Sequence, residues 1–461
     1  MSVQARVLGL IACTAAFFLL CGFGSDSAGR IGSDLVVTAA PVYVPLAALR
    51  GHERFPQGAR LLVVHEGKSE PLVRSFAASA DANVSFDATH VLFAGKKAAH
   101  DPWQIWELTL VDRALRQVTF GTEDAIRPLY LPGRRLVYAQ RGIAGFQIVS
   151  AALDSSADRD PLLPLTYAAA NSIPADVLAD GRILFESDFP LGTGATPELF
   201  LVYADGSGVE SYRCDHGVAR WEGKQLSSGD VIFTHGASLG RFSSPLAHEE
   251  RVAMPAARFD GAIVESKDGD WLISAKNAAD SYAAIKLWKP GSSTMATVVA
   301  QGGSDLVEPV LLAPRSAPKH HPSALHPWDY ANLLALDARI SRDGALKGVP
   351  ASVRVEMKDG NGHAVALGTS AIESDGSYFV KVPGDRPIRF AVLDAKGAML
   401  RQEHGWFWAR SGEQRICVGC HAGPEHAAEN RIPAVLLRTT TPTDLSSFPS
   451  AASQPVSAGG R

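Results

Sequence analysis

The chain has little cysteine and no excess of positive charge. Five cysteines are spread over 461 residues, and two of them, Cys13 and Cys21, lie in an apolar N-terminal segment. The remaining three are too few for a disulfide framework, so the fold must depend on its hydrophobic core. The formal net charge is -4, and the sequence has no long run of lysine and arginine. Phosphate backbones attract strongly basic surfaces, so we expect no nucleic-acid partner.

Long stretches with helical periodicity are also missing between residues 50 and 315, where short β-rich runs alternate with turns. A turn followed by a strand ending in a large apolar residue recurs roughly every 40–48 residues, the length of a four-stranded propeller blade. The strands of this series are residues 91–93, 136–138, 183–185, 231–233 and 271–273. Residues 116–119 resemble the closing strand of TolB-type repeats. We therefore predict a six- or seven-bladed, TolB/WD40-like β-propeller over residues 50–315, with a β-sandwich of accidental spacing as the alternative.

The N-terminus has the pattern of an export signal. Arg6 precedes an apolar run from residue 7 to about residue 24, and polar residues follow it. This predicts a signal peptide over residues 1–28 and a periplasmic protein. The run is long enough for an uncleaved membrane anchor. Residues 10–13 and 18–21 each resemble a lipobox, so a lipoprotein anchored through Cys13 or Cys21 also stays open. We expect contact with a membrane only in those two cases.

A second β domain is predicted after the propeller. Proline and histidine gather between residues 313 and 328, which indicates a linker, placed at residues 316–345. Strand-like runs at 353–357, 378–382 and 388–393, separated by Asp-Gly and Pro-Gly turns, then predict a small antiparallel sandwich within residues 346–438. The Thr-, Ser-, Pro- and Ala-rich residues 439–461 are expected to be partly disordered. The whole chain is thus predicted to be mainly β.

Cys417, Cys420 and His421 form a CxxCH motif. This spacing lets two thiols add to the two vinyl groups of one haem, with the adjacent histidine as iron ligand. A redox disulfide and a zinc half-site are the alternatives, but the βαβ context of the first and the second ligand pair of the other are missing. We expect one covalent haem c, with His421 as the proximal ligand of its iron. Attachment of c-type haem outside the cytoplasm agrees with the predicted export.

Residues 406–421, residues 430–433 and residues 375–383 together resemble the middle domain of the hydrazine synthase alpha subunit family. Members of that family share a PGE-x-R-x-C-x-G-C-H pattern, placed after a TolB-like propeller and a β domain. The resemblance implies an exported, haem-bearing β protein. It does not imply hydrazine synthesis, because the alpha subunit has a second haem domain and a tyrosine ligand shortly after its motif. This chain has one CxxCH motif, and residues 422–426 contain no tyrosine.

The second axial ligand decides between electron transfer and small-molecule chemistry, because a six-coordinate iron has no open position. The sequence leaves this ligand undecided among His404, His426 and Met399 and the linker histidines His320, His321 and His326.

Cys214, Asp215 and His216 form one further cluster. In relatives of hydrazine synthase a propeller cysteine and aspartate help to bind zinc beside the haem, so the resemblance implies a zinc ion or a haem-capping loop here. A buried cysteine beside a surface aspartate and histidine is the alternative.

Three functions follow from these features. The leading hypothesis is an exported monohaem cytochrome that transfers electrons, as a subunit of a redox complex with an unidentified redox partner protein. A hydrazine-synthase-like, haem-dependent oxidoreductase acting on a small nitrogen or oxygen compound is the main alternative. A haem-based sensor or binding protein is the third.

Overall fold

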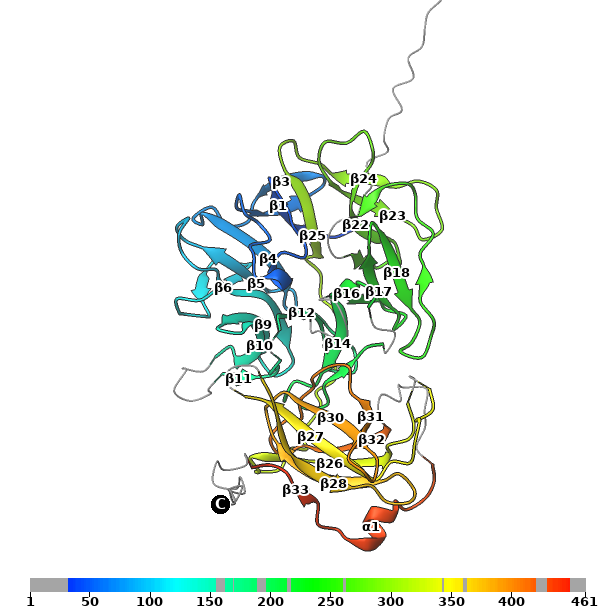
Figure 1. Ribbon diagram of the computed structural model, residues 1–461. Helices are drawn as coiled ribbons and strands as arrows, with labels where there is room; N and C mark the ends of the chain where they lie inside the picture. The colour runs from blue at the N-terminus through cyan, green and yellow to red at the C-terminus, as the bar shows by residue number, and fades with distance from the viewer. Residues whose placement is uncertain are drawn as a thin grey trace, which may run out of the picture.

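The computed structural model is mainly β, as the sequence predicts, and its strands form eight sheets within the described residues. Six sheets make up one body and two make up a second (Figure 1). The residues that the structure describes are 32–154, 162–168, 170–188, 196–213, 217–259, 263–341, 344–359, 363–419 and 429–447.

The six sheets of the larger body form a β-propeller. Each sheet contacts the next one along the chain, and the last contacts the first. The ring is closed by β1 (Leu35–Ala40), which pairs antiparallel with β25 (Asp305–Leu311), so both ends of the propeller chain share one sheet. That sheet also contains β2 (Arg60–His65) and β3 (Lys68–Pro71), and the 3-10 helix η1 (Ala48–Arg50) lies in the connection between β1 and β2.

The other five propeller sheets follow in chain order. They comprise β4 (Ala78–Val84), β5 (His90–Lys96), β6 (Gln104–Thr109) and β7 (Leu115–Gln117); β8 (Ala125–Leu131), β9 (Arg135–Gly142), β10 (Gly145–Ala152) and β11 (Leu163–Pro164); β12 (Ser172–Val177), β13 (Ile183–Ser187), β14 (Glu198–Val202) and β15 (Glu210–Ser211); β16 (Trp221–Gln225), β17 (Val231–His235), β18 (Ser238–Phe242) and β19 (Glu250–Arg251); and β20 (Arg258–Phe259), β21 (Val264–Glu265), β22 (Trp271–Lys276), β23 (Ala284–Trp288) and β24 (Ala296–Val299).

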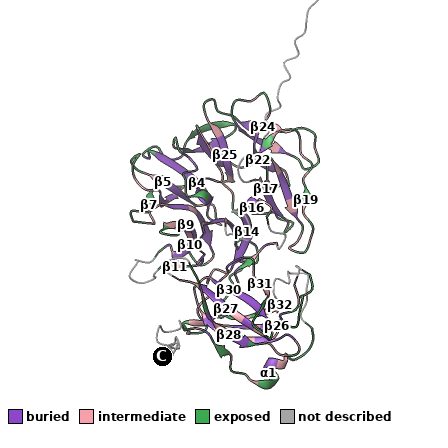
Figure 2. Cartoon of the chain, viewed as in Figure 1, coloured by how far each residue is buried: buried purple, intermediate pink, exposed green. Residues whose placement is uncertain are grey.

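The periodic strands seen in the sequence are the second strands of their sheets: β5, β9, β13, β17 and β22. Both faces of such a strand pack against neighbouring blades, so it is apolar throughout instead of alternating. Phe93, Tyr138, Phe185 and Phe233 are accordingly among the largest fully buried side chains, and Figure 2 shows buried residues along these blades.

The innermost strands share a bulge near the propeller axis. Asp81 in β4, Arg127 in β8, Glu222 in β16 and Glu308 in β25 all have φ between 54° and 60°. The strand register shifts at each of these positions. Non-glycine residues rarely adopt this left-handed conformation, and its recurrence in four blades indicates a built-in feature that turns charged side chains toward the axis.

The second body is a β-sandwich. One sheet has the order β32 (Gln414–Gly419), β26 (Tyr330–Asp337), β29 (Tyr378–Pro383), β33 (Thr443–Asp444), and the other β28 (Ala364–Ala371), β27 (Ser352–Lys358), β30 (Ile388–Leu393), β31 (Met399–Gln402). Side chains from both sheets, including Leu333, Val355, Val380 and Val392, share one core. The expected antiparallel arrangement is wrong at two places, because β32 and β33 run parallel to their partners β26 and β29. The helix α1 (Ala434–Arg438) precedes β33.

Several predicted boundaries differ from the structure. Strand β1 precedes the predicted propeller start at residue 50. Strand β26 lies inside the predicted linker 316–345. The linker was predicted from the prolines and histidines that come before this strand. Strand β33 lies inside the tail predicted to be disordered, and the buried Leu445 anchors it. The predicted signal peptide lies outside the described residues. No helix in the described ranges is both long and apolar enough to cross a membrane.

Candidate haem site

Cys417 lies on β32, at the edge of one sheet of the sandwich. The parallel pairing with β26 places it opposite Ala335. Its thiol is free, and the residue is partly buried. Burial raises the pKa of the Cys417 thiol, and the nearby Arg415 opposes this rise. The position of the first cysteine of the CxxCH motif is therefore fixed by the sheet.

The residues just before Cys417 are docked on the propeller. One carboxylate oxygen of Glu413 accepts a hydrogen bond from the backbone nitrogen of Arg410 at 2.7 Å, and the other accepts from that of Gly208 at 3.2 Å. Arg415 donates to the backbone oxygen of Val209. Gly412 has a φ of 83°, and a Cβ there would lie 2.0 Å from the backbone oxygen of His326. The turn leading into β32 is thus shaped by glycine and held by charged side chains.

An apolar and aromatic contact reinforces this docking. Trp406 and Trp408 belong to the same buried cluster as Leu165 and Val209 of the propeller. The rings of Trp408 and Tyr167 meet edge to face at 6.4 Å. The two bodies are therefore joined by a shared core at the third and fourth blades, beside the segment that carries Cys417.

Arg410 adds a polar link across the same junction. Its guanidinium donates to the backbone oxygen of Asp205 at 3.2 Å and also bonds Asp385 and the hydroxyl of Tyr167. Burial, followed by the nearby Asp385, raises the pKa of Tyr167. This link ties the sandwich domain to the third and fourth blades.

The chain that returns after the motif is held by Asp375. One of its carboxylate oxygens accepts from the backbone nitrogen and hydroxyl of Ser377, and the other from the backbone nitrogen of Ala434 at 2.8 Å and from Arg431. Burial opposes ionisation, but these hydrogen bonds hold the pKa of Asp375 well below its usual range. Asp375 thus clamps the segment after the motif, as Glu413 clamps the segment before it.

Gly419, between the two motif cysteines, lies where the packing leaves no room for a side chain. A Cβ at this position would lie 2.7 Å from both the Cβ and the backbone oxygen of Ile340. The end of β32 therefore approaches the loop after β26 too closely for a side chain. Cys420, His421 and His426 lie outside the described residues.

The upstream candidate ligands lie on or after β31. Met399 begins this strand and its side chain is 56% exposed. His404 follows the strand and is also exposed. Its neighbour Glu403 is close enough to Cys417 to raise the pKa of the thiol. The structure therefore brings Glu403, the neighbour of His404, near the first motif cysteine.

Two of the linker histidines are engaged in ring contacts. His326 stacks on Trp328 with ring centres 4.2 Å apart, and its Nε2 lies 2.7 Å from the side-chain nitrogen of Gln414. His321 packs on Tyr203 at 4.2 Å. His320 is exposed.

The cluster Cys214, Asp215 and His216 lies outside the described residues. The strand before it begins directly after Val209, whose backbone oxygen accepts from Arg415. The stem of the Cys214 loop therefore lies next to the strand that carries Cys417. Within the described ranges, no group of three potential ligands is arranged to hold a metal ion.

The described part of the motif fits a covalently attached haem. Cys417 is a free thiol on an edge strand, and the outer edge of β32 pairs with no other strand in the described part of the chain. A large group can therefore be attached there without breaking a sheet. The described segments before and after residues 420–428 are both held by charged side chains, Glu413 on one side and Asp375 on the other.

The described part of the chain is a six-sheet β-propeller joined to a β-sandwich, and the sequence carries a single CxxCH motif. Residues 357–422 match the family model described as "Hydrazine synthase alpha subunit middle domain", so the predicted resemblance is confirmed for this part of the chain. No curated protein matches the sequence significantly.

Among solved structures, Kuenenia stuttgartiensis hydrazine synthase is similar with a TM-score of 0.77 and 15% identity, covering 89% of this chain and 72% of that one. The chain is thus hydrazine synthase alpha-like in fold. TolB from Acinetobacter baumannii gives a TM-score of 0.47 and 13% identity, covering 63% of this chain and 68% of TolB.

Proposed function

We propose that this chain is an exported monohaem c-type cytochrome that transfers electrons as a subunit of a redox complex. Cys417 and Cys420 hold the haem and His421 is the proximal ligand of its iron. When bound, the haem supplies one-electron redox chemistry. The observation that carries the proposal is the clamping of the motif on both sides, by Glu413 before it and by Asp375 after it. A firmly positioned segment needs little rearrangement when the charge of the site changes.

The propeller and the cell compartment complete the proposal. The propeller provides a broad rigid surface on which a redox partner protein can dock. The protein acts in the periplasm after removal of residues 1–28, and a lipid anchor on Cys13 or Cys21 is the alternative. Cell fractionation together with the mass of the mature N-terminal peptide distinguishes these two forms.

The test is an absorption spectrum of the protein produced with a c-type maturation system, oxidised and reduced, with and without carbon monoxide. We expect a covalent haem whose reduced spectrum is unchanged by carbon monoxide. Cys417→Ala should abolish full covalent attachment, whereas Cys214→Ser, in the propeller, should leave it intact. Wild-type protein without covalent haem would overturn the proposal.

A hydrazine-synthase-like oxidoreductase is the second candidate function. It is supported by the fold shared with Kuenenia stuttgartiensis hydrazine synthase and by the stem of the Cys214 loop lying beside the Cys417 strand. For this function the haem iron would have an open or weakly held second axial position, and Cys214, Asp215 and His216 would hold a zinc ion near it. A prompt spectral shift with carbon monoxide, and a zinc content that is lost in Cys214→Ser, would favour it over electron transfer. A haem-based sensor would show the shift without the zinc.

A further inference from the structure

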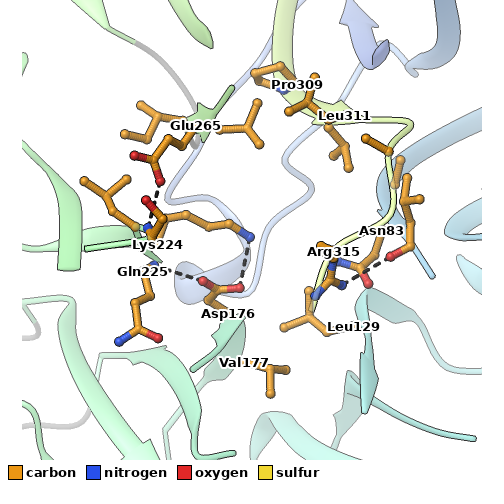
Figure 3. A pocket seen from close by; sticks show the side chains of 18 of the residues that line it. Asn83, Leu129, Asp176, Val177, Lys224, Gln225, Glu265, Pro309, Leu311 and Arg315 are labelled. Carbon is orange, nitrogen blue, oxygen red and sulfur yellow. Dashed lines mark hydrogen bonds and ion pairs between the residues drawn. The ribbon is translucent and has the colours of Figure 1, made fainter. Parts of the chain in front are cut away.

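A cavity of about 820 Å³ lies on the propeller axis. Strands β4, β8, β12, β16 and β25 line it together with β21 and residues 313–318 of the linker (Figure 3). All of its lining residues precede residue 319, so none of them belongs to the CxxCH segment. Its volume is within the range of small-molecule binding sites.

The connection between β1 and β2 fills the axis next to this cavity. Arg54 from this connection is buried, bonds Asp81 and lies 2.6 Å from Glu308. The hydroxyl of Tyr43 donates to Glu222 at 2.6 Å. Asn171, directly before β12, holds the connection by a 2.9 Å hydrogen bond to the backbone oxygen of Leu49. The cavity therefore has a fixed, charged floor.

The inner carboxylates of the cavity already have donors within the protein. Asp81 accepts from Arg54 and from the backbone nitrogen of Arg127. Glu308 accepts from Arg54 and Thr38. Asp176 accepts from Lys224 and from the backbone nitrogen of Gln225, both at 2.9 Å, and Glu265 accepts from that of Ser227 at 2.7 Å. The remaining acid, Asp268, lies on an exposed turn beside Lys267.

The basic side chains that line the cavity have N–H groups that donate no hydrogen bond in the part of the chain that the structure describes. Within the described residues, the Arg127 guanidinium makes no hydrogen bond: its nearest acidic oxygens, on Glu308 and Glu222, are 3.6 and 3.8 Å away, and its buried Nε has no partner. Among the same residues, the Arg315 guanidinium makes one hydrogen bond, to the backbone oxygen of Val84, and lies over the ring of Phe86. The ammonium of Lys224 has one partner, Asp176. Figure 3 shows Lys224 and Arg315 on opposite walls.

We propose that this cavity binds a small organic oxyanion whose carboxylate or phosphate oxygens accept from Arg127, Lys224 and Arg315. Asp81, Asp176, Glu265 and Glu308 already accept hydrogen bonds from the protein, whereas Arg127, Lys224 and Arg315 each keep N–H groups that donate to no acceptor within the described residues, so an occupant with acceptor oxygens matches the unused donors. The volume exceeds that of a simple inorganic ion and suits a metabolite of moderate size. Because Arg315 lies in the segment between β25 and β26 that leads to the sandwich domain, the bound anion also ties this segment to the third and fifth blades, which carry Arg127 and Lys224.

Isothermal titration of the haem-loaded protein with citrate and with inorganic phosphate, at low ionic strength, tests this site. Low salt is needed because counter-ions screen such contacts. We expect at least one of the two probes to bind, and Arg315→Gln to weaken that binding about tenfold, the loss typical of a charge-assisted hydrogen bond. Citrate without phosphate would indicate a carboxylate ligand, and phosphate without citrate a phosphorylated one.

Lys319→Gln is the matched control, since Lys319 is an exposed cation on the same linker outside the cavity. It should bind the probe like the wild type, and both variants should keep the wild-type haem spectrum and melting temperature. Absence of binding of both probes at millimolar concentration would overturn the proposal, as would equal affinity of Arg315→Gln and the wild type.

Discussion

The two bodies of this protein use charged side chains in different ways. On the propeller axis the side chains of Arg54, Asp81 and Glu308 are only 3%, 2% and 6% exposed. Beside the CxxCH motif, Asp375 and Arg431 are 21% and 30% exposed. Breaking a buried pair leaves an uncompensated charge, whereas a half-exposed partner is solvated by water. The axis charges should therefore control the stability of the propeller, and the clamp charges should control the order of the segment after the CxxCH motif.

Arg54→Ala should produce the largest effect. It leaves Asp81 and Glu308 buried without their shared cation, so the free energy of unfolding should fall by roughly 3–5 kcal/mol. Urea denaturation followed by tryptophan fluorescence measures this. Arg74→Ala removes an exposed cation 3.6 Å from Glu70 and should change stability by no more than about 0.5 kcal/mol. Equal effects of the two variants would remove the distinction between axis and surface charge.

Glu222 makes the stability of the propeller depend on pH. Burial, with a contribution from Glu186, raises the pKa of Glu222 to about 7 from an ordinary value of 4.5. The folded protein thus retains a proton that the unfolded chain releases, so this contribution to stability is complete below about pH 4.5 and is lost as the pH rises through about 7.

Glu222→Gln keeps the side chain neutral and can still accept from Tyr43. Between about pH 5 and pH 8 the wild type should lose roughly 2–3 kcal/mol of stability that the variant keeps. Urea denaturation at each pH measures the difference. Glu123→Gln, at an exposed position, should follow the wild-type profile, and parallel profiles of all three proteins would contradict the assignment to Glu222.

Gly419→Ala tests the sandwich side of the comparison. The new Cβ would lie 2.7 Å from atoms of Ile340, so the end of β32 must move. We expect a loss of about 1–3 kcal/mol in this domain and a lower yield of covalent haem, with the propeller unaffected. Gly302→Ala is the control, because a Cβ there meets no atom within 4 Å. Normal haem yield in Gly419→Ala would show that the close approach is not needed.

The sequence revealed features that repeat or that are local. The blade pattern was visible because β5, β9, β13, β17 and β22 each carry the same buried run. Strand β1 was missed because the residues that it joins, such as Thr38 and Glu308, are 270 positions apart. Strand β33 has two residues and depends on Leu445 for its place. Short or closing strands are set by tertiary partners that no local pattern contains.

The same limit applies to the candidate site. The CxxCH spacing is local chemistry and could be read directly. Arg410 and Glu413 were recognisable only by family resemblance, since their partners Asp205 and Gly208 are 205 positions away. The charged bulges on the axis had no signal, because Asp81 and Arg127 stand in otherwise ordinary strands.

Asp375→Asn should have the smallest effect of the four and is the sharpest test of a clamp that acts locally. The amide can still accept from Ser377, but it loses the charge that Arg431 pairs with, so stability should fall by only about 1 kcal/mol. Hydrogen exchange in residues 431–438 should become faster while exchange in the propeller strands stays the same. Asp394→Asn is the matched control, because Asp394 also accepts backbone hydrogen bonds in a turn, from Lys396 and Ala398, but pairs with no arginine within the described chain. If both variants leave exchange at 431–438 unchanged, the segment after the motif is held by the apolar contacts of Val435 instead of by the carboxylate, and charge would have no clamping role on that side of the CxxCH motif.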